Sequence, residues 1–520
     1  MRGAWGLTAA AALAVSCAGP RPWPQGLESA LSDCPEALED RTLSDLALYE
    51  RCRLPAALVK SVRNDYADDE LEPPDYAALD AFAGRVPREK LEYQLRTFVN
   101  PDDSLLGWFR LGNDGIQPDL LLAPERRVAL APPLGRPVEA AASTLQAPVE
   151  ADRPFRAERQ VELRAAARLG LPLAGLRVLI DPGHFGGRYA SFEQRRFEWP
   201  EGSAAGLLVI QEGDLTLRTA LELAAKLEAR GARVLLTRMA LEPTAGPDLA
   251  ALRPFADRLL RHLALDEPFA TARASLRPEA RTALDVAAAL FAIRKQFIFE
   301  TLRTRMRRSS TFEPDVTLSL HFNAGPWDGA RGAEEELVAM VRGNVGAGRA
   351  YNPAYRVRAL RDALAIDEFN AAAHLGALCL RAMSRTLGLP VSRKRRYADH
   401  VPIHAADGEP SGVAAWNGAV LRYATGPAVL LEGPYMNEVS ELPRLLDALR
   451  SPIGQPGTRT EQYASGVAQG LEDWARRWMA QERNDFGPEG LGLPAPVSSG
   501  DRLEPRPARP QCLPRGSPTG

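Results

Sequence analysis

Residues 176–180 read LRVLI, and the tetrapeptide DPGH follows directly at 181–184. A compact apolar run of this kind is typical of a strand buried inside a parallel sheet. The sequence therefore predicts a buried strand at 176–180, which His184 follows in the DPGH segment. The rest of the expected fold extends from this strand in both directions along the chain.

Three further apolar runs predict strands, at 234–236, 316–320 and 428–431. A helix is expected from Asp214, which can cap it, to about Arg230, and Gly231 then supplies the stop. A second long apolar helix is expected from Phe369 to Leu387. Strands that alternate with helices predict an α/β fold with a mostly parallel sheet flanked by helices.

Ionisable residues stand at the ends of the predicted strands. His184, His321 and Glu432 each follow a predicted strand, and Glu212 lies in the loop just before the predicted helix. In open α/β sheets, ligand sites lie beyond the carboxyl ends of the strands. These four residues, which are far apart in the chain, are therefore expected to meet at one edge of the sheet.

Two histidines and one carboxylate are a ligand set typical of catalytic zinc, because they leave one coordination position open for water. The metal would lower the pKa of that water toward ~7 and polarise a substrate carbonyl. A second carboxylate can take the proton of the water and pass it to a leaving amine. The residue set therefore fits zinc-assisted hydrolysis of an amide.

Five blocks, taken in order, resemble the zinc-dependent N-acetylmuramoyl-L-alanine amidases of the type 3 family. They are 178–184 (VLIDPGH), 212–215 (EGDL), 231–238 (GARVLLTR), 319–324 (SLHFNA) and 427–433 (PAVLLEG). The resemblance implies a twisted sheet flanked by helices. It also implies cleavage of the amide between N-acetylmuramic acid and L-alanine in peptidoglycan, with an activator protein as a further partner to be considered.

The resemblance also assigns roles to single residues. It implies that His184, Glu212 and His321 bind Zn²⁺ and that Glu432 is the catalytic carboxylate. The chain departs from the family in having Phe185 where glycine is common after the first histidine. The segment between the first two ligands is long, and it contains three rival carboxylate ligands, Glu193, Glu198 and Glu201.

The charge balance bears on the class of partner. The chain has 520 residues, of which 64 are Lys or Arg and 66 are Asp or Glu, so that the net charge is −2. A nucleic-acid binder needs a concentrated positive surface. The composition therefore argues against nucleic acid as a partner.

His400 and His404, which flank a polar loop, are expected either to be surface residues or to contact substrate.

The N-terminus resembles an export signal. Arg2 precedes an apolar run at 7–15, and Ser16 and Cys17 follow it, as in a secretory signal peptide. Residues 14–17 (AVSC) resemble the lipobox of bacterial lipoproteins, which implies that Cys17 is lipidated and anchors the protein to the outer membrane. Ordinary cleavage, with Cys17 removed or free, is the alternative. Export would also permit a disulfide between Cys34 and Cys52.

The chain divides into six expected parts. They are a lipoprotein-type signal peptide (1–17), a tether (18–28), a separate, mainly helical N-terminal region of unknown role (29–150), a helical lead-in (151–175), a zinc amidase domain (176–479) and a disordered tail (480–520). Within the amidase domain, 239–314 is an insertion, and apolar residues at helical spacing predict a helix over 279–308. That helix is expected to pack on the sheet or on the N-terminal region. In some relatives such an insert blocks the active site instead.

Two alternatives to the amidase remain open at this point. One is another zinc amidohydrolase or peptidase on the same scaffold. The other is a peptidoglycan-binding envelope protein that has lost turnover, which the complete set of His184, Glu212, His321 and Glu432 disfavours.

Overall fold

The computed structural model describes most of the chain between residues 74 and 480. The described ranges are 74–131, 154–199, 208–242, 267–324, 335–345, 353–394, 400–404 and 409–480, apart from the single positions 104, 113, 121, 124, 169, 188 and 194. The predictions for the signal peptide, Cys17, the tether, the Cys34–Cys52 pair and the tail beyond Ala480 lie outside the described residues.

Within the described residues, seven strands form one sheet in the order β10-β11-β9-β12-β8-β4-β7. The strands are β4 (Arg177–Pro182), β7 (Arg233–Leu236), β8 (Val316–Asn323), β9 (Val338–Arg342), β10 (Val401–His404), β11 (Pro410–Trp416) and β12 (Ala428–Tyr435). The strands β7, β4, β8 and β12 run parallel, as do β11 and β9, whereas β12 with β9 and β10 with β11 are antiparallel. The predicted α/β class with a mostly parallel sheet is confirmed.

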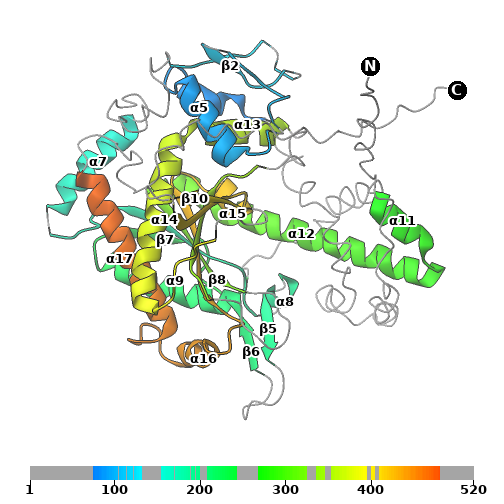
Figure 1. Ribbon diagram of the computed structural model, residues 1–520. Coiled ribbons are helices and arrows are strands. Elements are labelled where there is room, and N and C mark those ends of the chain that lie inside the picture. Colours follow the sequence, from blue (N-terminus) through cyan, green and yellow to red (C-terminus); the bar gives the residue numbers. More distant parts are fainter. Residues whose placement is uncertain are drawn as a thin grey trace, which may run out of the picture.

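One face of the sheet is covered by α9 (Glu212–Glu228) and α14 (Ile366–Leu387), and α17 (Arg459–Ala480) packs across both helices (Figure 1). Alternate strand residues point to this face, so that Val178 and Ile180 of β4 join the large apolar core with these helices. The helix α16 (Leu442–Arg450) lies at the end of this layer against α9 and α17. The α9 prediction needs one correction, because the helix begins at Glu212 and Asp214 lies inside its first turn instead of capping it.

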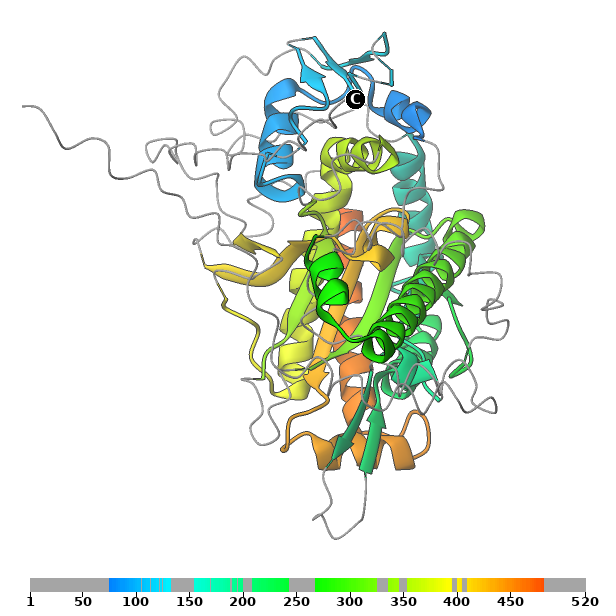
Figure 2. The ribbon, with the colours of Figure 1, turned by 90° about the vertical axis from the view of Figure 1, so that its right-hand side faces the viewer.

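The other face carries α12 (Pro278–Phe312) and the short helix α15 (Ala419–Tyr423). The intervening strand residues, such as Leu179 and Leu430, pack here with Met306 of α12 and Leu421 of α15. The C-terminal part of α12 lies against the sheet, whereas its N-terminal part extends away with α11 (Glu267–Ser275) (Figures 1 and 2). The residues 279–308, which were expected to be helical, all lie within α12.

The described part of the N-terminal region combines helical turns with a small sheet. Its elements are η2 (Tyr76–Phe82), α5 (Arg88–Gln94), η3 (Leu95–Val99) and the antiparallel strands β1 (Arg110–Leu111), β2 (Gly115–Gln117) and β3 (Val128–Ala129). These elements share one apolar core with α13 (Pro353–Leu364). Arg356 of α13 is buried there, 2.5 Å from Asp119 Oδ2 and 4.3 Å from the centre of the Trp108 ring. The described residues 74–131 therefore share an apolar core with α13.

The lead-in helix α7 (Pro154–Ala167) is tied to the sheet by Arg159, whose guanidinium contacts both carboxylate oxygens of Asp315 at 3.1 and 3.0 Å. No helix in the described ranges is by itself long and apolar enough to cross a membrane. The pair α13 and α14 passes the same test when taken together, but it is bent by 73° at the junction.

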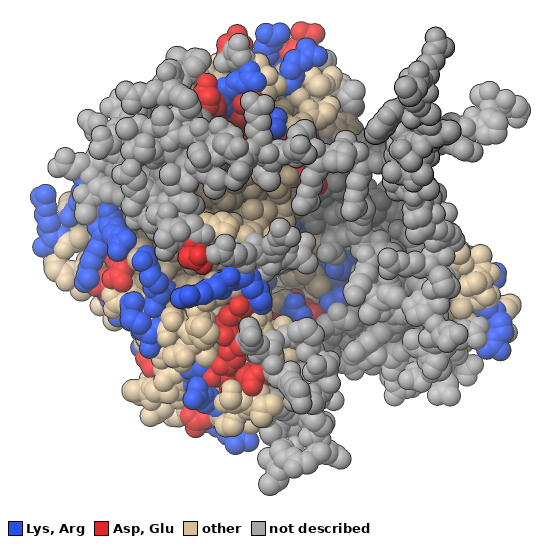
Figure 3. Space-filling model, viewed as in Figure 1, with Lys and Arg blue, Asp and Glu red and all other residues tan. Residues whose placement is uncertain are grey.

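Charged side chains of α9 and of the turn that follows it pair with α17. Lys226 Nζ lies 2.6 Å from Glu461 Oε1, and Arg230 Nε lies 3.0 Å from Glu472 Oε2. Over the described part of the face in Figure 3, positive and negative side chains are intermixed. Both pairs are partly open to solvent, and ion pairs at a protein surface each contribute only ~0–1 kcal/mol. The apolar contacts beneath them therefore hold the two helices together.

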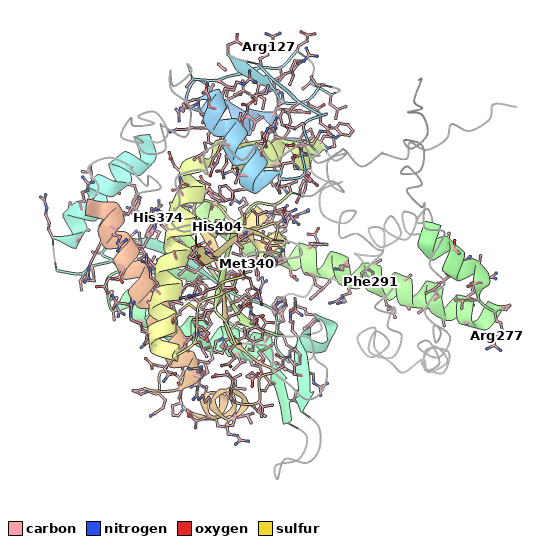
Figure 4. The ribbon with its side chains drawn as sticks, in the orientation of Figure 1. Arg127, Arg277, Phe291, Met340, His374 and His404 are labelled. Carbon is pink, nitrogen blue, oxygen red and sulfur yellow. The ribbon has the colours of Figure 1, made fainter. Side chains whose placement is uncertain are left out.

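The buried His374 on α14, labelled in Figure 4, makes the stability of the fold depend on pH. Burial, together with Arg477 and Arg381, lowers the pKa of His374 to about 3. The folded chain therefore keeps this imidazole neutral, while the unfolded chain takes up a proton below its ordinary pKa of ~6.5. The stability that the neutral His374 contributes is complete above that pH and is lost as the pH falls.

We expect His374→Gln to reduce this pH dependence. Between pH 7.5 and pH 5 the free energy of unfolding should fall by about 2 kcal/mol less in the variant than in the parent protein, at ~1.4 kcal/mol per pH unit below 6.5. Urea denaturation at the two pH values measures the difference. An equal decrease in the free energy of unfolding of both proteins would contradict the lowered pKa of His374.

Candidate metal centre

The turn after β4 places the first histidine. A Cβ at Gly183 would lie 2.5 Å from Cε1 and Nε2 of His321, so only glycine allows the imidazole of His321 to lie against this turn. The next residue, His184, has a φ of 53°, in the left-handed region that costs a side-chain-bearing residue ~1 kcal/mol or more. The carbonyl of Gly183 accepts hydrogen bonds from Thr216 Oγ1 at 2.5 Å and from Arg238 Nη2 at 3.2 Å. These bonds fix the turn and hence the direction of the His184 ring.

The N-terminus of α9 places Glu212. A Cβ at Gly213 would lie 2.0 Å from the carbonyl carbon of Phe185, so the helix packs directly on the backbone of the His184 turn. Glu212 is the first residue of α9, where the helix dipole favours a negative charge, and it does not lie in the preceding loop as expected. Its Oε1 accepts the N–H of Phe322 at 3.2 Å and lies 3.0 Å from His321 Nδ1.

His321 and Glu432 lie side by side on neighbouring strands. They are register partners in the parallel pair β8 and β12, so their side chains point to the same face of the sheet. This is the face that carries α12, because Leu430 packs there two residues before Glu432. The hydroxyl of Tyr463 donates to the carbonyl of Leu431 at 2.7 Å and also lies 3.2 Å from the carbonyl oxygen of His321, so that it contacts both strand ends.

The structure thus brings His184, Glu212 and His321 together. One ligand atom from each lies within 4.8 Å of the others, and His184 Nε2 is 3.6 Å from Glu212 Oε2. Zinc binds imidazole nitrogen and carboxylate oxygen at ~2.0–2.2 Å, so small side-chain shifts suffice to close this group around one ion. The donor set and its spacing therefore fit zinc.

Arg195 contacts two members of this group, His184 and Glu212. Its Nε lies 3.1 Å from both His184 Nε2 and Glu212 Oε2. A guanidinium only donates hydrogen bonds, so His184 Nε2 must carry a lone pair and the ring proton must sit on Nδ1. Nothing in the sequence singled out Arg195, which is one of two adjacent arginines in the long loop.

The carboxylates of the site differ in their proton affinity. Burial would raise the pKa of Glu212, but the charges of His184, His321 and Arg195 and the hydrogen bond from His321 outweigh burial and lower this pKa to about 2. Burial raises the pKa of Glu432 to about 7, and the charge of Glu212 adds to the effect. Glu212 is therefore a permanent anion, whereas Glu432 can exchange a proton near neutral pH.

Of the rival ligands, Glu193 is the one whose side chain the structure describes. It contacts His184 at Nδ1, at 3.1 Å, and not at the nitrogen that faces Glu212. The side chain of Glu198 and all of Glu201 lie outside the described residues. His400 is stacked on Trp416 with ring centres 5.5 Å apart, and His404 is the last residue of the edge strand β10.

The inserted helix α12 supports the site from behind. Phe297, which is fully buried, stacks on Tyr189 of α8 (Tyr189–Phe192) at 5.3 Å and lies 6.3 Å from the ring of Phe185. Arg305 donates to the carbonyl of Pro182 at 3.1 Å. The insert therefore packs against both ends of the turn that carries His184.

Comparison with protein-family models and with curated proteins found no match. Among solved structures, Cwp6 from Clostridium difficile is 17% identical over 58% of this chain and 29% of its own, with a TM-score of 0.30. The CwlD amidase from Clostridioides difficile, solved in complex with the GerS lipoprotein, is 12% identical over 58% and 100%, with a TM-score of 0.31. The N-acetylmuramyl-L-alanine amidase Ami1 from Mycobacterium smegmatis is 16% identical over 59% and 99%, also with a TM-score of 0.31. At these low values the function has to be inferred from the chain's own residues.

Removing the stacked ring of Phe297 should weaken both the fold and the metal centre. We expect Phe297→Ala to lower the free energy of unfolding by ~3–5 kcal/mol and to weaken zinc binding, because the turn at His184 loses its support. Phe291→Ala, on the part of the same helix that extends away from the sheet (Figure 4), is the matched control and should leave zinc affinity unchanged. Denaturation and titration with a competing chelator measure the two quantities. Equal zinc affinities in the two variants would show that α12 does not support the site.

Arg195 should compete with zinc for the same two ligands. We expect Arg195→Ala to bind zinc about three- to tenfold more tightly, because the ion no longer has to displace a guanidinium held by ~1 kcal/mol of hydrogen bonding. Arg196→Ala, which removes the neighbouring exposed charge, is the control. Weaker zinc binding by Arg195→Ala would mean that Arg195 helps to hold the metal.

Proposed function

We propose that the chain is a zinc-dependent hydrolase of the cell envelope that cleaves the amide between N-acetylmuramic acid and L-alanine in peptidoglycan. The observation that carries the proposal is the group of His184, Glu212 and His321 with Glu432 beside it. Three ligands of this kind suit catalytic zinc, and a fourth, separate carboxylate suits proton transfer. The five sequence blocks that resemble type 3 amidases supply these four residues in the family's order.

The roles of the residues follow from their surroundings. Bound zinc would polarise the amide carbonyl and make water acidic enough to attack it near neutral pH. His184, Glu212 and His321 hold the ion, and the low pKa of Glu212 keeps its charge available as a ligand at any physiological pH.

Glu432 moves the proton. With a pKa raised to about 7 by burial, it can accept a proton from the attacking water and still release it readily. As the carbon–nitrogen bond breaks, the same proton passes to the leaving L-alanine nitrogen. The second proton of the water then leaves the new carboxylic acid for the released amine, so that a carboxylate and an ammonium group are formed. Glu432 ends the cycle in the ionised state in which it began.

The remaining parts of the chain fit an enzyme of the envelope. Peptidoglycan lies outside the cytoplasm, which agrees with the signal peptide expected at 1–17 and with a membrane anchor at Cys17. The proposal therefore includes export by the signal peptide and anchoring through Cys17. It also includes 176–479 as the catalytic domain, with 239–314 as its insertion.

Substitutions of Glu432 and Glu212 should affect catalysis and metal binding differently. We expect Glu432→Gln to keep zinc and to lose ~100- to 10,000-fold in turnover, because the amide cannot transfer a proton. Glu212→Gln should weaken zinc binding as well, because it removes a charged ligand. Elemental analysis gives the zinc content, and mass spectrometry of sacculi incubated with each protein gives the products.

The product spectrum also decides among the candidate functions. Free L-alanine amino termini support the amidase, whereas cleavage elsewhere in the stem peptide would indicate a different zinc peptidase. Unchanged sacculi with bound protein would indicate a binding protein without turnover. If Glu432→Gln loses zinc while Glu212→Gln keeps it, the two roles are exchanged.

A further inference from the structure

Glu193 is a buried carboxylate that the proposed reaction does not use. It follows α8 in the loop between β4 and β5 (Arg196–Trp199), and its side chain is 3% exposed. Its Oε2 lies 3.1 Å from His184 Nδ1 and accepts the N–H of Phe185 at 2.7 Å. A carboxylate is buried at a large cost unless it is paired and hydrogen-bonded, and these two contacts supply its partners.

The position of Glu193 excludes it from the ligand set around Glu212. The two nitrogens of an imidazole point along different directions, and Glu193 meets Nδ1 while Glu212 and Arg195 meet Nε2. Glu193 therefore cannot coordinate an ion that is bound by His184 through Nε2.

Two contacts on opposite sides of the ring define the same tautomer. The Nε–H of Arg195 points at His184 Nε2 at 3.1 Å, which requires a lone pair on that nitrogen. The proton then sits on Nδ1, where Glu193 accepts it. This is the tautomer that a metal ion at Nε2 needs, because a protonated nitrogen cannot bind a metal.

The backbone of Glu193 is held in place from two sides. Its N–H donates to the carbonyl of Tyr189 at 3.0 Å, and its carbonyl accepts from Arg294 Nη2 of α12 at 3.1 Å. The carboxylate also binds the N–H of Phe185, next to the left-handed residue His184. A single side chain thus fixes both the backbone after the strained residue and the ring of that residue.

We propose that Glu193 is a positioning residue that holds His184 with Nε2 directed at the metal. This inference rests on the proposed zinc site but not on the identity of the substrate. Carboxylates that accept a hydrogen bond from the second nitrogen of a metal-bound histidine fix its orientation, and their loss weakens metal binding or activity by ~10- to 100-fold.

The experiment uses the full chain and two substitutions. Glu193→Ala removes the acceptor, and Glu193→Gln keeps an acceptor of the same shape without the charge. Glu228→Gln, which removes a carboxylate at the exposed far end of α9, is the matched control. Zinc affinity is measured by competition with a chelator. The tautomer of His184 is read in the metal-free protein from ¹⁵N chemical shifts of its ring, which can be assigned because the chain has six histidines.

We expect Glu193→Ala to bind zinc ~10- to 100-fold more weakly and Glu193→Gln to show a smaller loss, with Glu228→Gln unchanged. In the parent protein the His184 ring should carry its proton on Nδ1, and Glu193→Ala should move protonation toward Nε2. A merely structural role would lower the melting temperature and leave the tautomer unchanged.

The outcomes separate this inference from the proposed function. Glu193→Ala with parent zinc affinity and the parent tautomer would overturn the positioning role. If Glu193→Ala no longer binds stoichiometric zinc while the tautomer of His184 is unchanged, Glu193 is a metal ligand and not a positioning residue. If zinc affinity and tautomer change as expected while the parent protein leaves peptidoglycan intact, the positioning role stands and the proposed substrate is wrong.

Discussion

Backbone contact at two glycines is the constraint on which the rest of the centre depends. Gly183 lets the His321 ring lie on the turn after β4, and Gly213 lets the first turn of α9 press against the backbone at Phe185. With side chains at these positions, β4, β8 and α9 would have to move apart, and the candidate ligands that they carry would move with them. Close packing at this point thus sets the distances among His184, Glu212 and His321, and their chemistry follows from those distances.

The same site gives two buried glutamates opposite properties through their neighbours alone. Glu212 is surrounded by two imidazoles, a guanidinium and a backbone N–H, and its charge is stabilised. For Glu432 on strand β12, burial and the nearby charge of Glu212 outweigh the charges of His321, Arg195 and His400, so its pKa is raised and its neutral form is favoured. A permanent anion and an exchangeable proton carrier are what hydrolysis of an amide at a metal centre requires.

The sequence predicted the four central strands, because apolar runs of four or five residues at 176–180, 316–320 and 428–431 have a strong signal, as does the shorter run at 234–236. It also predicted which residues would meet, because they stand at strand ends. It missed β9, although its sequence VAMVR contains an apolar run as long as the one at 428–431. It also missed β10 (VPIH) and β11 (PSGVAAW), which contain proline or glycine, residues that are depleted in strands. The contacts of Glu193 and Arg195 could not be predicted from the sequence either. They depend on how the loop between β4 and β5 folds back over the turn at His184, and on the inserted helix α12 behind that turn.

The core that the N-terminal region shares with α13 has a consequence for how the chain can be divided. Leu79, Leu91 and Ile116 pack against Tyr355 and Leu360, and Arg356 is neutralised there by Asp119. A truncated catalytic fragment that starts after this region would expose the apolar face of α13 and would remove the carboxylate of Asp119 from the Arg356 guanidinium. Residues 74–131 and α13 therefore cover each other's apolar surfaces, and a fragment that keeps α13 needs these residues to cover it.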